Sequence, residues 1–535
     1  MRTQRLDGSP QGIARAGEIL RAGGLVAIPT ETVYGLAANA LDGSAIQKIY
    51  AAKERPGDNP LIAHIGEVSQ LAALVKAVPP AAQRLAEAFW PGPLTIILER
   101  SGLTAPEMSC GLDTVSVRLP AHPLAQAVIQ AAGVPLAAPS ANRSGRPSPT
   151  CFSHVWEDLN GRVDAILDGG GCPVGVESTV VSLAGERPRL LRPGGVTLAQ
   201  LESVLGPVEV DPAVLSRLEP GREAPSPGMK YKHYAPQAEV VMVDASPEEF
   251  ASYVNARAEE GLFALCFDET APLLHVPSVA YGPCFDPEAQ ARRLFEALHQ
   301  LDQLGARRVY AQRPSQRGVG LAVYNRLIRA AAFRVERPQT PAVIGLVGPS
   351  GAGKSTVARF LARQGFSHLD CDKVTKSAGV YDYNCIKDLR EAFGGEVAPD
   401  FVLDRQALAQ RAFQSPQGVR TLQAITFPRI LAEVRRRMEA RTGPLLLDAP
   451  TLFEAGLDGA CRRILAVTAP EAERLARVMA RDGLGEAEAR LRFRAQPGED
   501  FYTSRADWVV ENGPGVELEK RCAALAAELK SGGCL

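Results

Sequence analysis

The chain has 535 residues, of which 46% are hydrophobic and 22% charged, and its formal net charge at neutral pH is -1. One hydrophobic core does not grow to that length, so we expect roughly three or four domains. The near-neutral charge excludes the global basic field that drives nonspecific nucleic-acid binding, although it leaves room for a local basic cleft.

Neither export nor membrane insertion is indicated. The N-terminal segment contains Asp7 and Glu18 and no apolar run, and the uncharged stretch 119–142 is interrupted by four prolines. Ten cysteines are scattered without Cys-x-x-Cys pairs, which favours reduced thiols over a disulfide framework or a zinc site. We therefore expect a cytoplasmic protein with no membrane partner.

Two joints divide the chain. Gly221–Pro236 is rich in proline, glycine and charge, and Arg334–Pro341 is short, charged and proline-rich. We expect a first domain at 1–210, a linker at 221–236, a second domain at 237–336 and a third at 341–535.

Strand-like apolar runs alternate with helical patterns along the whole chain, which predicts α/β layers. In the first domain the expected strands are Leu25–Ile28, Leu61–Ile65, Thr95–Leu98, Val115–Leu119, Val134–Ala138 and Val180–Leu183. In the second they are Glu239–Val243, Phe263–Cys266 and Arg308–Ala311, with a helix at Pro287–Leu304. In the third they are Ala342–Val347, His368–Asp370, Pro444–Leu447 and Arg463–Val467.

Polar residues at strand ends of the first domain indicate a ligand site. Lys53 and Arg55 stand in a proline-bracketed loop, where two cations can grip a polyphosphate, although such a pair alone is more often a solvated surface. His64 and Arg118 alternate with core positions on their strands, and either alone is more often solvent-facing. The loop 138–142 and Ser178 add small polar groups where open α/β sheets place ligands.

Seven segments in this part of the chain resemble, in family order, the YrdC/Sua5 family of threonylcarbamoyl-AMP synthases. They are PTETVYGLAANA, KERPGDNPLIAHI, WPGPLTIIL, VSVRLPAHP, APSANRSGRPSPT, ESTVVSL and LLRPGG. The segment SPGMKYKHYAP is similar to the family's linker, and GVGLAVYNRLIRAA resembles the C-terminal domain of the longer, Sua5-type members.

This resemblance implies that L-threonine, bicarbonate and ATP give threonylcarbamoyl-adenylate and diphosphate, with Lys53 and Arg55 as catalytic cations. The product would pass to the machinery that threonylcarbamoylates adenosine 37 of tRNA, so tRNA would be only an indirect partner. The implied threonine-binding residues are Thr32, His64, Arg118, the backbone of Ala138, and Ser178. The implied ATP-binding residues are Lys53, Arg55, Asn59, Thr114, Ser140, Ser148, Arg192 and Tyr234, the last reaching back from the linker.

The third domain opens with a phosphate-binding loop. Gly348–Thr356 reads GPSGAGKST, follows the apolar run Ala342–Val347 and precedes an apolar-periodic helix. Glycines at 348, 351 and 353 let the backbone N–H groups converge on a triphosphate, and Ala352 and Thr356 belong to the same loop. Lys354 can reach the terminal phosphates, and the Ser355 hydroxyl can ligate Mg²⁺.

Acidic and basic residues elsewhere in the third domain indicate that this nucleotide-binding domain is a kinase. Asp372 and Asp448 follow expected strands, which would place both beside the phosphates; the alternative is that they only cap the next helices. Asp448 is a candidate for the outer coordination sphere of Mg²⁺. Arg474, Arg477 and Arg481 recur at helical spacing, as a lid over ATP needs, although such a run alone is more often a solvated face.

Residues 341–530 resemble dephospho-CoA kinase. The carriers are the phosphate-binding loop, LDCDKV, AFGGEV, VLDRQALAQRAF, LLLDAPTLFEAGL, VTAPEAERLARVMARDG, RFRAQ and ADWVVENGP. The resemblance implies phosphoryl transfer from ATP to the ribose 3′-hydroxyl of dephospho-CoA, with Asp372 as the base, Lys354 on the triphosphate and a coenzyme-A-binding helical stretch at about 375–440. Phe427 stands where the family has a histidine before proline, which bears on substrate contact.

The resemblances together imply an α/β chain. Its parts would be a YrdC-like twisted open sheet, a small Rossmann-like Sua5 C-terminal domain, and a P-loop kinase domain with a parallel sheet and a helical substrate subdomain. Such a chain would be a bifunctional enzyme that uses ATP, bicarbonate and Mg²⁺. The rival interpretation is an RNA-binding module fused to a degenerate or differently specific P-loop kinase; the near-neutral charge speaks against strong RNA affinity.

Overall fold

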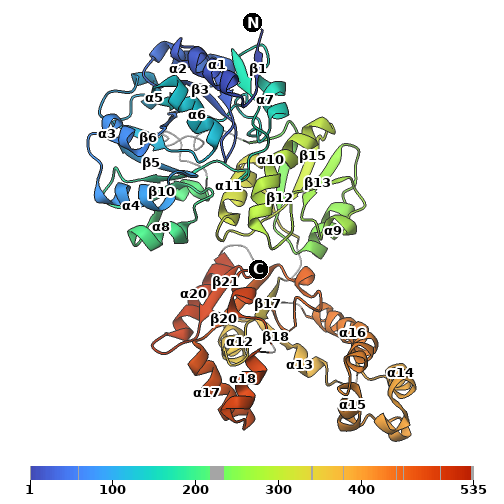
Figure 1. Ribbon diagram of the computed structural model, residues 1–535. Helices are drawn as coiled ribbons and strands as arrows, with labels where there is room; N and C mark the ends of the chain where they lie inside the picture. Colours follow the sequence, from blue (N-terminus) through green and yellow to red (C-terminus); the bar gives the residue numbers. More distant parts are fainter. Residues whose placement is uncertain are drawn as a thin grey trace. The chain divides into compact units, whose positions relative to one another are not determined.

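The computed structural model describes residues 2–57, 59–216, 234–338, 342–377, 379–441, 443–449, 451–494 and 496–531. The chain forms two compact units, one made of Met1–Val243 and Phe250–Arg337 and the other of Asp244–Glu249 and Pro338–Leu535. Both units combine sheets with helices (Figure 1), so the predicted α/β class is confirmed. All but the last three residues of the predicted linker lie outside the described residues.

The first unit contains an eleven-stranded sheet in the order β1-β8-β2-β3-β7-β4-β6-β5-β9-β10-β11. Its strands are β1 Gln4–Leu6, β2 Val26–Ile28, β3 Gly35–Asn39, β4 Ile62–His64, β5 Leu94–Glu99, β6 Thr114–Arg118, β7 Leu136–Ala137, β8 Ala165–Leu167, β9 Thr179–Ser182, β10 Arg189–Arg192 and β11 Glu209–Val210. The predicted strands are confirmed, but the sheet is mixed: β3 and β7 are antiparallel to their neighbours, while β4 and β6 are parallel.

Eight helices accompany this sheet within the described residues. They are α1 Pro10–Arg21, α2 Gly43–Lys53, α3 Leu71–Leu74, α4 Pro80–Phe89, α5 Pro106–Ser109, α6 Pro123–Ala132, α7 Phe152–Leu159 and α8 Leu198–Leu205. Helix α1 begins at Pro10 because the Ser9 side chain accepts the Gly12 backbone N–H. It packs closely on α6, where a Cβ at Gly17 would come within 2.8 Å of the Ala131 backbone, so only glycine permits this approach.

A second sheet of the first unit is parallel throughout, in the order β14-β13-β15-β12-β16. Its strands are β12 Glu239–Val243, β13 Leu262–Cys266, β14 Ser278–Ala280, β15 Arg308–Gln312 and β16 Val335–Glu336, with helices α9 Pro247–Asn255, α10 Pro287–Gln303 and α11 Gly320–Ala330. The apolar core around this sheet includes Val33 and Val176 of the first domain. The two predicted domains therefore share one compact unit.

The second unit is built on a five-stranded parallel sheet in the order β18-β19-β17-β20-β21. Its strands are β17 Val343–Val347, β18 Ser367–Asp370, β19 Leu445–Asp448, β20 Arg463–Thr468 and β21 Trp508–Glu511. The helices are α12 Lys354–Arg363, α13 Cys371–Val374, α14 Tyr383–Phe393, α15 Arg405–Ala412, α16 Pro416–Glu439, α17 Glu471–Asp482, α18 Glu486–Arg494, α19 Glu499–Thr503 and α20 Leu518–Ser531.

Helices α14, α15 and α16 form a separate group beside the parallel sheet (Figure 1). Their own apolar core contains Cys385, Leu389, Val397 and Leu408. The predicted helical subdomain is therefore present. Among the described helices, none combines the length and the apolar character needed to cross a membrane.

Candidate functional site

Segments that are distant in sequence surround a small cavity, about 60 Å³ in volume, in the first unit. The loop after β2, the end of α2, the ends of β4 and β6, the loop after β7 and the start of β9 all contribute lining residues. The predicted residues that line it are Thr32, Lys53, Arg55, His64, Arg118, Ala138, Ser140, Ser178, Arg192 and Tyr234. The structure thus brings all the predicted threonine-binding residues and most of the predicted ATP-binding residues together.

Three predicted residues do not line this cavity. Asn59 is fully buried beside it, and neither atom of its side-chain amide has a hydrogen-bond partner among the described residues. Ser148 donates a hydrogen bond to the carboxylate of Glu177, which does line the cavity. Thr114 begins β6, whereas Arg118 ends it, so the strand holds Thr114 away from the cavity.

Lys53 is the most deeply buried cation of this site. Its side chain lies at the end of α2, and Nζ donates to the backbone oxygens of Ser140 and Asn142. Burial, followed by the charge of Arg55, lowers the pKa of Lys53 well below its ordinary value. A bound anion would raise the pKa of this lysine again, so the position suits a phosphate group.

Arg118 is held by an acid that the sequence analysis did not single out. Its Nη2 lies 2.6 Å from Oε1 of Glu31, and its Nη1 donates to the Thr32 hydroxyl at 2.9 Å. Burial raises the pKa of Glu31, but the charge of Arg118 and its hydrogen bond outweigh burial and leave that pKa below its ordinary value. Glu31 is therefore ionised and fixes the guanidinium.

His64 ends β4 and is 2% exposed. Burial and the neighbouring charge of Arg118 lower its pKa to about 3, so the imidazole is neutral at physiological pH. Nδ1 lies 3.2 Å from the carbonyl oxygen of Ile62, a contact that requires a proton on Nδ1. Nε2 is then a hydrogen-bond acceptor in a cavity that is otherwise rich in donors.

A buried ion pair connects the cavity to the second sheet of the same unit. Nε of Arg326, a fully buried residue of α11, lies 2.7 Å from Oε2 of Glu177. Arg192 also borders this carboxylate and donates to the backbone and side-chain oxygens of Ser178 at 3.0 and 3.1 Å. Sequence reasoning missed Glu177 and Arg326, although both stand inside segments that carry the family resemblance.

Tyr234 closes the cavity from the end of the predicted linker. It has a φ of 66°, and the next residue, Ala235, donates its N–H to the carbonyl oxygen of Gly145 at 3.1 Å. The ring lies 5.6 Å from that of Phe295 on α10. The end of the linker is therefore anchored on both parts of the first unit.

The lining of this cavity is strongly cationic. Its charged members are five cations and a single carboxylate, namely Lys53, Arg55, Arg118, Arg146, Arg192 and Glu177. Such a balance suits a polyanion, because several guanidinium and ammonium groups share its charge away from bulk water.

The second unit has a larger cavity, about 660 Å³ in volume, around the phosphate-binding loop. Gly351 and Gly353 have φ values of 79° and 94°, and a Cβ at Gly351 would come within 2.5 Å of the Arg474 backbone. The predicted residues that line it are Gly348, Gly351, Gly353, Lys354, Ser355, Thr356, Asp372, Asp448, Arg477 and Arg481. Ala352 is buried beneath the loop and does not line the cavity.

The neighbouring acids Asp370 and Asp372 have different roles in this cavity. Asp370, which the sequence analysis did not assign, caps α13 by accepting the Lys373 backbone N–H at 3.2 Å. Asp372 therefore is not the cap of that helix, which argues against the alternative interpretation of this residue. Partial desolvation, followed by the charges of Asp370 and Asp448, raises the pKa of Asp372. A raised pKa makes this carboxylate a better proton acceptor.

Lys354 and the arginines of α17 face the phosphate-binding loop. Nζ of Lys354 donates to the Gly348 carbonyl oxygen at 2.8 Å, and burial lowers the pKa of this lysine. Arg474 and Arg477 donate to the carbonyl oxygens of Ser350 and Gly351 at 3.1 and 3.3 Å. The predicted lid helix thus lies against the loop.

Further residues of this cavity were missed by sequence reasoning. Thr451, Glu454, Arg492, Gln496 and Tyr502 also line it. Phe427 lies half-buried within α16 and is not among the lining residues. The oxygen donors of Ser355, Asp372 and Asp448 share one cavity, and such donors suit the preference of Mg²⁺ for hard oxygen ligands.

Sequence models of three families match successive parts of the chain. The Sua5/YciO/YrdC model, described as telomere recombination, matches residues 18–194. The model of the threonylcarbamoyl-AMP synthase C-terminal domain matches 196–332, and that of dephospho-CoA kinase matches 342–517. The order agrees with the two units.

Individual relatives agree with these matches. Threonylcarbamoyl-AMP synthase of Bacillus subtilis is 45% identical over 339 residues, which is 63% of this chain and 97% of the relative. Dephospho-CoA kinase of Thermus thermophilus is 41% identical over 197 residues, which is 36% of this chain and 94% of the relative.

A solved structure is also similar to the first unit. The crystal structure of P. abyssi Sua5 complexed with L-threonine has a TM-score of 0.59 and 41% identity, and the match covers 63% of this chain and all of that one. From the two cavities, the matching domains and these relatives together, the chain belongs to the threonylcarbamoyl-AMP synthase family in its first part and to the dephospho-CoA kinase family in its last.

Proposed function

We propose that the first unit converts L-threonine, bicarbonate and ATP into threonylcarbamoyl-adenylate and diphosphate. The observation that carries this proposal is the buried cationic cavity, in which predicted threonine and ATP contacts lie side by side. The activity for which the Bacillus subtilis relative is named and the L-threonine complexed with P. abyssi Sua5 support the same substrate. The product would serve tRNA modification, with tRNA bound by other proteins.

The reaction needs no protein nucleophile. The threonine amine adds to the carbon of bicarbonate and loses a proton while a C–O bond breaks, so that water leaves and a carbamate forms. A carbamate oxygen then attacks the α-phosphorus of ATP, and the bond to the β-phosphate oxygen breaks, so diphosphate leaves. Lys53, Arg55 and Arg192 stabilise the charge that develops on the phosphates. Threonine lies against Thr32, His64, Arg118, Ser178 and the backbone of Ala138, where the neutral His64 accepts a hydrogen bond from it.

Closure of this cavity protects reactive intermediates. A carbamate and a mixed anhydride both react with water, so the site must exclude it while they form. The cavity of about 60 Å³ is far smaller than the ~300–1,000 Å³ of typical ligand sites, since Lys53 and Tyr234 occupy part of the space. We therefore expect ATP to displace both side chains as it enters.

The test is a threonine-dependent exchange of labelled diphosphate into ATP in the presence of bicarbonate. The wild-type chain should exchange, and Lys53→Met should lower the rate at least ~100-fold because it removes a cation from the phosphates. Lys76→Met, which changes a lysine exposed at 61% of its side chain, should exchange normally. Exchange that does not depend on threonine would contradict the proposal.

We also propose that the second unit transfers a phosphoryl group from ATP to the ribose 3′-hydroxyl of dephospho-CoA. Asp372 accepts the hydroxyl proton, Lys354 and the loop hold the triphosphate, and Arg477 and Arg481 close over it. Ser355 would hold Mg²⁺ with support from Asp448, and the ion would supply positive charge that neutralises the phosphates. The helices α14, α15 and α16 would hold the coenzyme moiety.

ADP release that depends on dephospho-CoA tests this second proposal. Asp372→Asn should abolish it while ATP still binds, because the amide cannot accept the proton. The control is Asp400→Asn, an exposed residue of the helical subdomain whose φ of 49° asparagine tolerates well. Wild-type turnover by Asp372→Asn would refute the assignment of the base.

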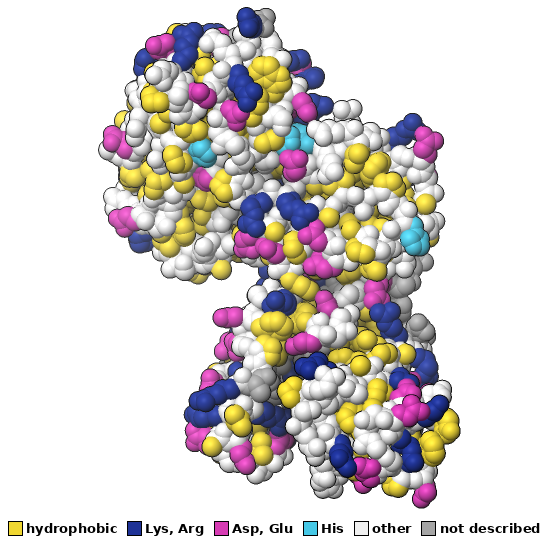
Figure 2. Space-filling view, turned by 45° about the vertical axis from the view of Figure 1, so that its right-hand side comes forward, with side chains coloured by type: hydrophobic (Ala, Val, Ile, Leu, Met, Phe, Trp, Pro, Cys, Tyr) yellow, Lys and Arg dark blue, Asp and Glu magenta, His cyan; other side chains and the backbone are white. Residues whose placement is uncertain are grey.

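An RNA-binding module with a degenerate kinase remains the rival from another class. Figure 2 shows acidic and basic side chains interspersed over one face of the described residues, a pattern that gives little electrostatic attraction for RNA. Tight RNA binding without diphosphate exchange would favour the rival. On the proposed account, 1–210 and 237–336 act together as the cytoplasmic synthase, and 341–535 acts as the kinase.

A further inference from the structure

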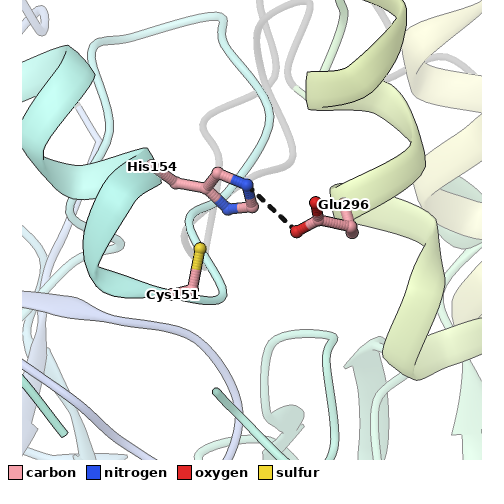
Figure 3. A group of neighbouring side chains, drawn as sticks. All are labelled: Cys151, His154 and Glu296. Carbon is pink, nitrogen blue, oxygen red and sulfur yellow. Dashed lines mark ion pairs between the residues drawn. The ribbon is translucent and has the colours of Figure 1, made fainter. Parts of the chain in front are cut away.

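A group of metal-binding side chains lies between two helices of the first unit, apart from both proposed active sites. Cys151 directly precedes α7, His154 lies in its first turn, and Glu296 projects from α10. Figure 3 shows His154 and Glu296 pointing toward each other, with the Cys151 sulfur beneath the imidazole. One donor atom from each residue lies within 4.8 Å of the others, and Nε2 of His154 is 3.1 Å from Oε2 of Glu296.

The donor set distinguishes among metals. A thiolate, an imidazole and a carboxylate together suit Zn²⁺, whereas Mg²⁺ and Ca²⁺ prefer oxygen donors alone. Ligand atoms around a tetrahedral zinc ion at ~2.0–2.3 Å lie about 3.3–3.8 Å apart. The three donors lie within 4.8 Å of one another, with the His154–Glu296 contact at 3.1 Å, so small shifts in either direction reach this spacing.

A second histidine beside this group has a ring nitrogen without a partner. His299 is one helical turn after Glu296, is 6% exposed, and stacks on His154 with ring centroids 3.8 Å apart. Its Nε2 has no hydrogen-bond partner among the described residues. A buried nitrogen of this kind is costly unless a ligand or water satisfies it. This observation indicates a missing polar group beside the stacked rings of His154 and His299.

We propose that Cys151, His154 and Glu296 form a zinc site that joins α7 to α10, with a water molecule as the fourth ligand. That water would offer Nε2 of His299 the partner that it lacks. The Glu296 side chain is 60% exposed, so the ion can enter from solvent. The inference stands apart from the proposed reactions, since neither uses these residues.

The site would stabilise the wall of the synthase cavity. The segment before Cys151 contains Ser148, whose hydroxyl donates a hydrogen bond to the carboxylate of Glu177. It also contains Pro149, whose carbonyl oxygen accepts a hydrogen bond from the Tyr34 N–H at 2.9 Å. Zinc bound to Cys151 and Glu296 would hold this segment against α10, in the same part of the unit where Tyr234 packs on Phe295. The expected role is structural, in the docking of the two parts of the first unit.

The sequence did not predict this group of Cys151, His154 and Glu296. A scattered set of cysteines without Cys-x-x-Cys pairs speaks against zinc, but here the pattern is Cys-x-x-His at the start of one helix and Glu-x-x-His within another. Each pair has the spacing that places two side chains on one helical face. Only the tertiary packing of α7 on α10 brings the two pairs together.

The experiment uses the full chain, stripped with a chelator and then titrated with Zn²⁺, with bound metal measured by elemental analysis and affinity by calorimetry. We expect one zinc ion per chain, and at least ~10-fold weaker binding in Cys151→Ser, His154→Gln and Glu296→Gln. Co²⁺ in the same place should give a thiolate charge-transfer band that Cys151→Ser lacks. Zinc should also raise the melting temperature of the wild type.

Matched controls are Cys284→Ser, His275→Gln and Glu288→Gln, which remove the same donor types elsewhere in the same unit and should bind zinc like the wild type. Because Glu296 is largely exposed, Glu296→Gln should fold normally, and a melting temperature without zinc equal to that of the zinc-free wild type checks this. Equal zinc affinity in the wild type and Glu296→Gln, or a cobalt complex without the thiolate band, would overturn the proposal in favour of a simple hydrogen-bonded group.

Discussion

The two nucleotide cavities of this chain bury their cations to very different degrees. In the first unit Lys53, Arg118 and Arg192 are all less than 8% exposed, and the cavity holds about 60 Å³. In the second unit the cavity holds about 660 Å³, and Arg481 pairs at the surface with Asp482. A reaction that makes labile intermediates benefits from seclusion, whereas direct phosphoryl transfer needs an open approach and a lid.

The two sites also differ in the groups that hold their cationic side chains in place. In the first cavity Glu31 holds Arg118, and Glu177, which pairs with Arg326, borders Arg192, so these two arginines are held in place before any phosphate arrives. Around the phosphate-binding loop, backbone carbonyl oxygens of Gly348 and Gly351 receive the side chains of Lys354 and Arg477. We expect the first site to depend on long-range packing and the second on the loop itself.

Removing Lys354 of the phosphate-binding loop should give the largest difference between the activities of the two sites. Lys354→Ala should lower the dephospho-CoA-dependent release of ADP at least ~10³-fold, since the ammonium group stabilises the transferred phosphate. Diphosphate exchange by the first unit should stay unchanged in the same preparation. Lys387→Ala, an exposed lysine of α14, is the control. Parallel loss of both activities would mean that the two sites are not independent.

Breaking the buried ion pair between Arg326 and Glu177 should have the reverse effect, with loss of diphosphate exchange and retention of kinase activity. Arg326→Met leaves the Glu177 carboxylate buried and unpaired, so we expect a loss of about 3–5 kcal/mol in the stability of the first unit and loss of diphosphate exchange. Kinase activity should persist. Arg293→Met, which breaks an exposed pair with Asp268, should cost under ~1 kcal/mol. Urea unfolding measures both, and equal shifts would contradict the role of burial.

The secluded site should also show a pH signature. The pKa of His64 is about 3 in the folded protein against an ordinary value of 6.5, so the unfolded chain binds the extra proton between these values. Folding stability contributed by the neutral His64 is therefore complete above 6.5 and falls by up to ~1.4 kcal/mol per pH unit below it.

His64→Gln should flatten the decline in stability between about pH 4 and pH 6.5. The exposed His275 gives the matched variant, His275→Gln, which should decline like the wild type. Urea unfolding at several pH values measures the slopes. Identical slopes in all three proteins would show that His64 is not the buried neutral group that we describe.

The smallest effect should come from the residue that departs from the kinase family. Phe427 lies within α16 and does not line the nucleotide cavity. Phe427→His should therefore change the KM for dephospho-CoA less than ~10-fold and leave the KM for ATP unchanged. A much larger gain in kcat would indicate that a histidine at this position contacts the reacting groups.

Much of the fold was predictable because its strands are apolar and bounded by turn residues. The predicted strands of all three sheets are present, with shifts of one or two residues at their ends. Short strands such as β10 and β11 were missed, since two to four residues do not establish an alternating pattern. The mixed order of the first sheet depends on long-range pairing that no local pattern encodes.

The site residues also divide into those that a local sequence pattern predicts and those that depend on long-range contacts. The phosphate-binding loop is contiguous in sequence, so its residues were predicted almost completely. The buried acids Glu31 and Glu177 were missed because their function is to hold arginines that lie 87 and 149 residues away. The predicted ATP contact Thr114 lies at the opposite end of β6 from Arg118, and residue type alone does not indicate which end of a strand meets the cavity.

Strand β16 ends the second sheet of the first unit at Glu336, and β17 begins the next sheet at Val343. Both units belong to one polypeptide, so a cell makes them in equal numbers. Proteolysis that starts on one unfolded half would carry away its neighbour too, so an inherited or engineered weakness in either catalyst would reduce the abundance of both.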